Sequence, residues 1–79
     1  MPLLAAAPGS VVRVVELRGG RGFQRRMLEM GIGPGSTLRV VGSWGPVVVE
    51  VVNGGSVQRV AIGRGMAVKI YVEEVPGRA

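Results

Sequence analysis

A single helical pattern, flanked by glycines, stands in a chain that is otherwise typical of short strands. In residues 18–35, apolar side chains recur at Phe23, Met27 and Met30, a spacing of i, i+4 and i+7. This spacing predicts one buried face of a short helix over residues 21–30, and Leu28 widens that face. Gly31 follows at the position where a left-handed residue commonly ends a helix. Any fold for this chain therefore has to place one short helix among strands.

The remaining sequence predicts five short strands, because apolar residues alternate with polar ones between turn signals. We expect these strands over residues 10–17, 36–41, 47–52, 56–62 and 68–73. Their inward side chains are expected to be Val12, Val14, Leu38, Val40, Val47, Val49, Val51, Val60, Ile62, Val68, Ile70 and Val72. Leu17 breaks the alternation of the first strand, so we expect a β-bulge near residues 15–16.

The turns are marked by glycine. The dipeptide Asn53-Gly54 predicts a type I′ hairpin turn between the third and fourth strands, because both central residues of that turn need a positive φ. Residues 63–66 are expected to hold one helical turn before the last strand. Near the start of the chain, Leu3 or Leu4 is expected to pack across one end of the sheet.

Length and composition indicate one mainly β domain. The chain has 79 residues, of which 14 are glycine and 47% are hydrophobic. A chain of this length buries enough surface for one small core only, so we expect a single domain over residues 1–79 with its core in residues 3–75 and a tail at 76–79. Five strands with tight turns favour a small closed or nearly closed barrel, since closure removes exposed strand edges.

The residue types that carry most protein chemistry are missing. The chain has no histidine, cysteine or aspartate, and its Glu16, Glu29 and Glu50 fall on separate predicted elements. Glu73 and Glu74 are neighbours that would point to opposite faces of a strand. General acid–base catalysis and metal binding both need convergent groups of these types. We therefore predict that the protein is not an enzyme and holds no cofactor and no tight metal site.

The charge of the chain leaves two classes of partner open. Ten Lys and Arg against five Glu give a net charge of +5, which suits an acidic protein partner or a nucleic acid. A small basic nucleic-acid-binding barrel is therefore the alternative function. Single-strand binders stack bases on several aromatic side chains, whereas this chain has only Phe23, Trp44 and Tyr71. No signal peptide or membrane-spanning run is evident, so a cytoplasmic location is expected.

One motif links the helix to a known family. Gly19-Gly20 is followed by Arg-Arg-Met-Leu-Glu-Met-Gly-Ile at residues 25–32 and then by Pro34-Gly35. Over about residues 3–75, with Pro8-Gly9 and residues 67–72 at the two ends, the chain resembles the FeoA family, the small cytoplasmic components of ferrous iron uptake. Residues 63–66 depart from that family, since this turn keeps only one charge.

The resemblance implies an SH3-like five-stranded barrel with one short helix after the first strand. It also implies an accessory protein of ferrous iron uptake that binds and modulates the membrane transporter FeoB, through the cytoplasmic GTP-binding part of that transporter. Such a protein would meet the inner face of the membrane only through its partner. Activation or restraint of transport, dependence on nucleotide and a weak homo-oligomer all stay open.

The candidate partner-binding residues lie on the predicted helix and on one loop. The exposed side of the helix and the loop around Trp44 carry the charge cluster and the one unassigned large aromatic side chain. The candidates are Arg18, Arg21, Arg25, Arg26, Glu29, Met30 and Trp44. The plainer interpretation is a solvated arginine face, with Trp44 folded over an end of the barrel. The solvent-facing side of the hairpin at residues 47–62 is the next candidate surface.

Overall fold

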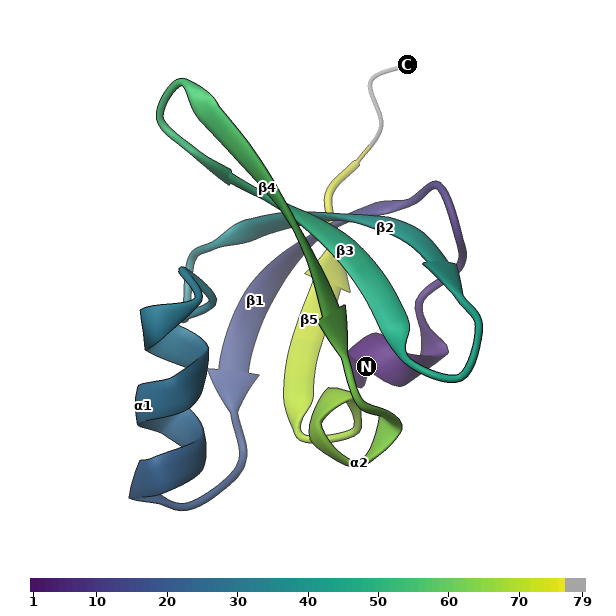
Figure 1. Cartoon of the computed structure of the whole chain (residues 1–79). Coiled ribbons are helices and arrows are strands. Elements are labelled where there is room, and N and C mark those ends of the chain that lie inside the picture. The colour runs from purple at the N-terminus through teal and green to yellow at the C-terminus, as the bar shows by residue number, and fades with distance from the viewer. Residues whose placement is uncertain (77–79) are drawn as a thin grey trace.

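The computed structural model describes residues 1–76, apart from the side chain of Asn53, and it is mainly β (Figure 1). The expected residues 77–79 of the tail lie outside the described residues. The elements, in chain order, are the 3₁₀ helix η1 (Leu3–Ala5), β1 (Val11–Leu17), α1 (Arg21–Glu29), β2 (Thr37–Ser43), β3 (Val47–Asn53), β4 (Ser56–Ile62), α2 (Arg64–Ala67) and β5 (Ile70–Glu74). The five expected strands and the single longer helix after the first strand are thus confirmed.

The strands form one antiparallel sheet that is strongly curved but does not close. Their order is β4-β3-β2-β1-β5, and within residues 1–76 no pairing joins β4 to β5. Figure 1 shows the sheet wrapping around the core, with α1 beside β1 and the hairpin of β3 and β4 projecting beyond the rest of the molecule. Between the described residues, the sheet is therefore open and does not form the closed version of the expected barrel.

The core lies inside the curve of this sheet. Leu3 of η1 is completely buried there, and Leu4 is partly buried and also packs against the core. The buried hydrophobic residues are Leu3, Val12, Val14, Leu17, Met27, Ile32, Leu38, Val40, Val47, Val49, Val51, Ile62, Ala67, Ile70 and Val72. Most of the expected inward side chains are confirmed, while Val60 is only half-buried.

A β-bulge explains how Leu17 reaches the core. The register of β1 against β5 shifts between Val14 and Glu16, as expected from the broken alternation. The extra residue rotates the end of the strand, so Leu17 faces inward again. A second shift, between Val40 and Gly42 in the pairing of β2 with β3, was not expected. It accompanies an extension of β2 to Ser43.

Two local predictions are wrong. Val68 does not begin the last strand: it caps the C-terminus of α2 and is 43% exposed, and β5 starts at Ile70. The hairpin turn is shifted by one residue, since β3 continues to Asn53 and the central residues are Gly54 and Gly55. Only Gly54, with φ +59°, has a positive φ, which is typical of a type II′ turn rather than type I′.

The helix α1 ends as expected but buries less than expected. Gly31 has a φ of +79° and follows the last helical turn. Met27 is fully buried, whereas Phe23 and Met30 are half-buried. Leu28 does not widen this face, because it is 58% exposed and lies about 100° around the helix from Met27. Within residues 1–76, no helix is long and apolar enough to cross a membrane.

Candidate functional site

The side of α1 that points away from the sheet forms a shallow hollow, which we name the outer face. Its volume is about 450 Å³, and it is lined by Arg21, Gln24, Arg25, Leu28 and Glu29. All five side chains are exposed. Leu28 supplies an apolar centre and packs close to Gly33, where an added Cβ would lie 2.5 Å from the Leu28 Cδ2 atom. The outer face therefore combines an apolar centre with charges of both signs.

The charges of α1 have no partners within the described part of the chain. Arg21, Arg25, Arg26 and Glu29 form no hydrogen bond or ion pair through their side chains among residues 1–76. On the sheet, by contrast, Arg13, Arg39 and Arg59 are paired, and the Arg13 Nη2 atom, for example, lies 2.8 Å from a Glu73 carboxylate oxygen. The guanidinium groups of α1 are thus available to a ligand.

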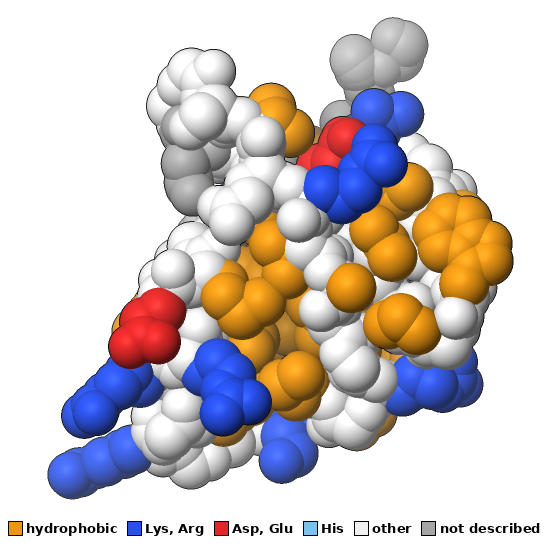
Figure 2. Space-filling model, viewed as in Figure 1, with side chains coloured by type: hydrophobic (Ala, Val, Ile, Leu, Met, Phe, Trp, Pro, Cys, Tyr) orange, Lys and Arg blue, Asp and Glu red, His pale blue; other side chains and the backbone are white. Residues whose placement is uncertain are grey.

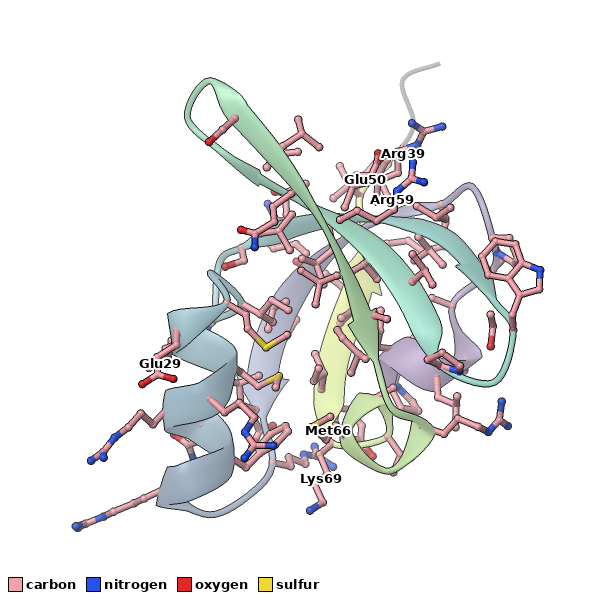
Figure 3. All side chains as sticks on the ribbon, in the orientation of Figure 1. Glu29, Arg39, Glu50, Arg59, Met66 and Lys69 are labelled. Carbon is pink, nitrogen blue, oxygen red and sulfur yellow. The ribbon has the colours of Figure 1, made fainter. Side chains whose placement is uncertain are left out.

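Arg26 belongs to a second hollow, between α1 and α2. This hollow has a volume of about 330 Å³ and is lined by Gly22, Phe23, Arg26, Met66 and Lys69. The Lys69 Nζ atom lies 5.5 Å from the centre of the Phe23 ring. Figure 3 shows Met66 and Lys69 together beside α2, across from α1. Arg25 and Arg26 are adjacent in sequence but therefore lie in different hollows.

Arg18 directly follows β1, and its side chain packs against residues of the sheet and not on α1. Its Nε atom donates a hydrogen bond to Glu16 at 3.1 Å, and its guanidinium carbon lies 3.7 Å from the centre of the Tyr71 ring. The hydrogen bond to Glu16 is the main cause that raises the pKa of Arg18 above its ordinary value. Arg18 is thus charged and engaged on β1 and β5, which makes it the least available candidate arginine.

Trp44 is exposed but distant from α1. Its side chain is 69% exposed, and its ring packs against Gly42, where an added Cβ would meet the ring at 2.5 Å. Figure 1 places the loop between β2 and β3 on the opposite side of the molecule from α1. The expected single surface of helix and Trp44 loop is therefore not formed. Met30, half-buried against the core, offers little area to a partner.

The structure thus groups Arg21, Arg25 and Glu29 on one face and adds two residues to them. Gln24 was missed and Leu28 was assigned to the buried face, because the helical pattern was used to find that face. The signal was present, since Leu28 lies outside the i, i+4, i+7 series of the buried residues. Met66 and Lys69 could not be found in this way, because only the tertiary fold brings α2 beside Phe23 and Arg26.

The first turn of α1 departs from the usual rules for a stable helix. The N-cap is Gly20, which has no side chain to accept a hydrogen bond from the free N–H groups. The first turn contains Arg21 and no acidic residue, although the positive end of the helix dipole favours anions there. Arg21 and Arg25 are like charges four residues apart, a weakly destabilising spacing. These residues do not stabilise the isolated helix, but their positive charge would favour an anionic ligand at its N-terminus.

Comparison with known proteins identifies the family. The FeoA domain matches residues 1–74, nearly the whole chain. The chain belongs to the FeoA family. A Methanocaldococcus jannaschii protein named "Putative Fe(2+) transport protein A" is 39% identical over 74 residues, which span 92% of this chain and 85% of that protein.

Solved FeoA structures share the fold. A crystal structure of the iron uptake regulatory protein FeoA superposes with a TM-score of 0.81 and 36% identity, covering 94% of this chain and 95% of that one. The solution structure of FeoA from Chlorobium tepidum has a TM-score of 0.78 over 100% of this chain and 74% of that one. Its identity of 22% shows likeness of fold alone. These structures confirm the expected SH3-like fold of this FeoA chain.

The acidic residues do not form a metal-binding cluster in the described part of the chain. Within residues 1–76, no group of three or more His, Cys, Asp or Glu side chains lies close enough to hold a metal ion. Glu29 points out from α1, while Glu50 lies across the molecule between Arg39 and Arg59 (Figure 3). No convergent set of carboxylates is thus present in the described part of the chain.

Proposed function

We propose that this FeoA protein acts in ferrous iron uptake as a cytoplasmic accessory protein that binds FeoB. The outer face of α1 is the docking surface, and the partner is the cytoplasmic GTP-binding part of the transporter. Membership of the FeoA family and the relative named for Fe(2+) transport support the role in iron uptake. The observation that carries the docking surface is the combination of Arg21, Arg25 and Glu29, without partners in the described chain, around the exposed Leu28.

The chemistry of this face favours a complementary surface with an apolar centre and an acidic flank. Exposed charges that have no partner of their own can steer association with an oppositely charged surface. Leu28 adds apolar area that is removed from water on binding, at about 25 cal/mol per Å². Because Arg21 and Arg25 lie toward the first turns of the helix and Glu29 lies in its last turn, the face also fixes the orientation of a partner.

The nucleic-acid alternative gains little from the structure. Of the three aromatic side chains, Phe23 and Tyr71 are half-buried and Arg18 covers the Tyr71 ring. Trp44 is left as the one freely exposed aromatic platform, and it lies far from the arginines of α1. Proteins that bind single strands without sequence preference stack successive bases on several such rings. A protein partner therefore explains the surface better.

A charge reversal on the outer face tests the proposal. We expect Arg25→Glu to weaken binding to the GTP-binding part of FeoB several-fold and to slow association most at low salt, because electrostatic steering is screened by ions. Binding is measured by surface-based kinetics over a range of salt concentrations, and function by iron uptake in cells lacking the native protein. The melting temperature should stay nearly unchanged, since exposed charges contribute little to folding.

The matched control is Arg64→Glu. Arg64 is an exposed arginine of α2 that lines neither hollow, so its reversal changes the net charge equally and leaves the docking surface intact. Equal weakening by both variants would show that only the net charge matters. Unchanged binding and uptake with Arg25→Glu would remove the outer face of α1 as the docking surface. In parallel, Arg26→Glu reports whether the hollow between α1 and α2 takes part.

A further inference from the structure

The two edges of the sheet differ in what covers them. At β5, the N-terminal ammonium group donates to the Val72 carbonyl at 2.9 Å, and the Val72 N–H donates to the Met1 carbonyl at 2.7 Å. Pro2 forms a bridge with Tyr71 next to these bonds. At the other edge, β4 pairs with β3 alone within residues 1–76. The start of the chain therefore covers one edge and leaves the other open.

Three residues of β4 direct their backbone groups toward this open edge. The two-residue turn makes Asn53 and Ser56 a hydrogen-bonded pair, so every second pair from there, such as Val51 with Gln58, carries the bonds between β3 and β4. The N–H and C=O groups of the intervening residues point away from β3. These residues are Val57, Arg59 and Ala61, and none of them takes part in another backbone hydrogen bond among residues 1–76.

Apolar side chains flank the open edge on both faces of β4. On the outer face, Val57 is 61% exposed and lies opposite Val52, which is 48% exposed. This apolar pair sits on the part of the hairpin that projects from the molecule (Figure 1). On the inner face, Val60 is half-buried and packs against the core. Figure 2 shows apolar side chains gathered in the gap between the hairpin and α1, where the sheet does not close. A strand placed beside β4 would thus bury apolar surface on each side.

The centre of the edge carries excess positive charge. The Arg59 Nη2 atom lies 2.9 Å from one Glu50 oxygen, and the Arg39 Nη1 atom lies 3.5 Å from the other. Figure 3 shows the three side chains together on the outer face. Two guanidinium groups therefore share one carboxylate, which leaves one positive charge uncompensated. Arg59 is the member of this group on the edge strand. Its guanidinium has five N–H donors, so it can donate hydrogen bonds to a second carboxylate.

This charge decides between two kinds of occupant. A second copy of the chain, paired edge to edge through β4 with its central residues opposite, would place Arg59 against Arg59, and like charges directly opposite in a sheet are destabilising. A strand with a carboxylate at that position would instead match the edge. The neighbouring strand β3 has this pattern, with Glu50 between Val48 and Val52. These three residues lie opposite Ala61, Arg59 and Val57 of β4, with Glu50 facing Arg59.

We propose that the open edge of β4 binds an extended segment of another protein, in which a carboxylate stands between two apolar residues at alternate positions. The segment adds a sixth strand to the sheet. Backbone hydrogen bonds with Val57, Arg59 and Ala61 supply most of the affinity, and the carboxylate facing Arg59 supplies the selectivity. This interaction does not depend on the docking proposed for the outer face of α1, which lies on a different element.

A designed peptide tests the proposal with the full chain. The probe is the capped heptapeptide Thr-Val-Thr-Glu-Thr-Val-Thr, added to the ¹⁵N-labelled protein. We expect slower hydrogen exchange and shifted resonances for the amides of Val57, Arg59 and Ala61. The amides of Gln58 and Val60, which already bond to β3, should change much less. A second peptide with lysine in place of glutamate should bind about two- to tenfold more weakly, as expected for an exposed ion pair that becomes a repulsion.

Two charge reversals provide a matched pair of variants. Arg59→Glu should invert the preference, so that the lysine peptide binds better than the glutamate peptide. Arg39→Glu also places a carboxylate beside Glu50, but on β2, two strands from the edge, so the original preference should persist. Each variant removes one ion pair of the same Glu50 carboxylate, and thermal unfolding of each would reveal a folding defect.

Three results would overturn the proposal. The first is an absence of change at the Val57, Arg59 and Ala61 amides when the glutamate peptide is present in large excess. The second is an equal loss of preference in the Arg39→Glu and Arg59→Glu variants, which would show that the edge does not select the carboxylate. The third is protection of the same three amides without peptide that grows with protein concentration, which would make a second copy the occupant.

Discussion

The two faces of α1 contribute to the molecule in opposite ways. The inner face buries Met27 completely and half-buries Phe23 and Met30 against the sheet. The outer face leaves all of its side chains exposed, including the apolar Leu28. Met27 and Leu28 are adjacent in sequence and similar in size, yet only one of them touches the core. The comparison teaches that burial, not hydrophobic character, decides which residues of this helix serve folding and which are free for binding.

The largest expected effect comes from the inner face. Met27→Ala should lower the free energy of unfolding by about 2–5 kcal/mol, because it removes a fully buried side chain and leaves a cavity. Leu28→Ala should change it by only about 0.5 kcal/mol or less, since that side chain is already largely in water. Urea unfolding followed by circular dichroism measures both values. An equal loss of unfolding free energy in the two variants would show that the two faces contribute equally to stability.

Most of the fold could be predicted because it follows from local patterns. Alternating valines marked the strands, and the odd position of Leu17 marked the bulge between Val14 and Glu16. Val68 was assigned to the last strand because it alternates with Ile70 and Val72. In the structure it is the C-cap of α2, and the strand begins only at Ile70. The open edge of β4 could not be predicted, since alternation shows which residues face inward and not which strands meet.

The candidate site was predicted in part. The exposed charges of α1 followed from the helical pattern, and Arg21, Arg25 and Glu29 do share one face. Three-dimensional contacts decided the rest, because Arg18 engages Tyr71, Met30 packs on the core and Trp44 lies across the molecule. Sequence spacing within one helix is fixed by its geometry, whereas distances between a helix and a distant loop depend on the whole fold.

A smaller effect should separate stability from binding on the outer face. Arg21→Glu places an anion at the positive end of the helix dipole and creates a favourable i, i+4 pair with Arg25, so it should stabilise the protein by about 0.3–1 kcal/mol. The same change should weaken binding to the FeoB GTP-binding part, because it reverses a charge of the proposed docking surface. Thermal unfolding and binding kinetics test the two effects on the same sample.

The opposite directions of these two effects make the test sharp. A merely damaged protein would lose both stability and binding, whereas the proposed role predicts a gain in one and a loss in the other. A variant that is more stable and binds FeoB as well as the parent would show that Arg21 is only a solvated charge. Arg64→Glu supplies the comparison at equal net charge, since Arg64 lies on α2.

The smallest expected effect concerns the N-cap and separates the order of α1 from its charge. Gly20 has an extended backbone, with φ −73° and ψ −179°, and a Cβ added there would meet nothing within 4 Å. Gly20→Ser should therefore fit without strain, and its hydroxyl can accept a hydrogen bond from a free N–H of the first turn, for a gain of about a few tenths of a kcal/mol. Hydrogen exchange of the α1 amides should slow slightly.

Because Gly20→Ser adds no charge and lies outside the outer face, binding to FeoB should not change. This result, beside a loss of binding in Arg21→Glu, would assign recognition to the charges of the outer face. If Gly20→Ser itself alters binding while the arginines stay in place, the order of the helix controls recognition instead. The weak N-cap would then be part of the binding mechanism. Ordering the helix in advance weakens binding only if the backbone of the first turn differs between the free and the bound protein.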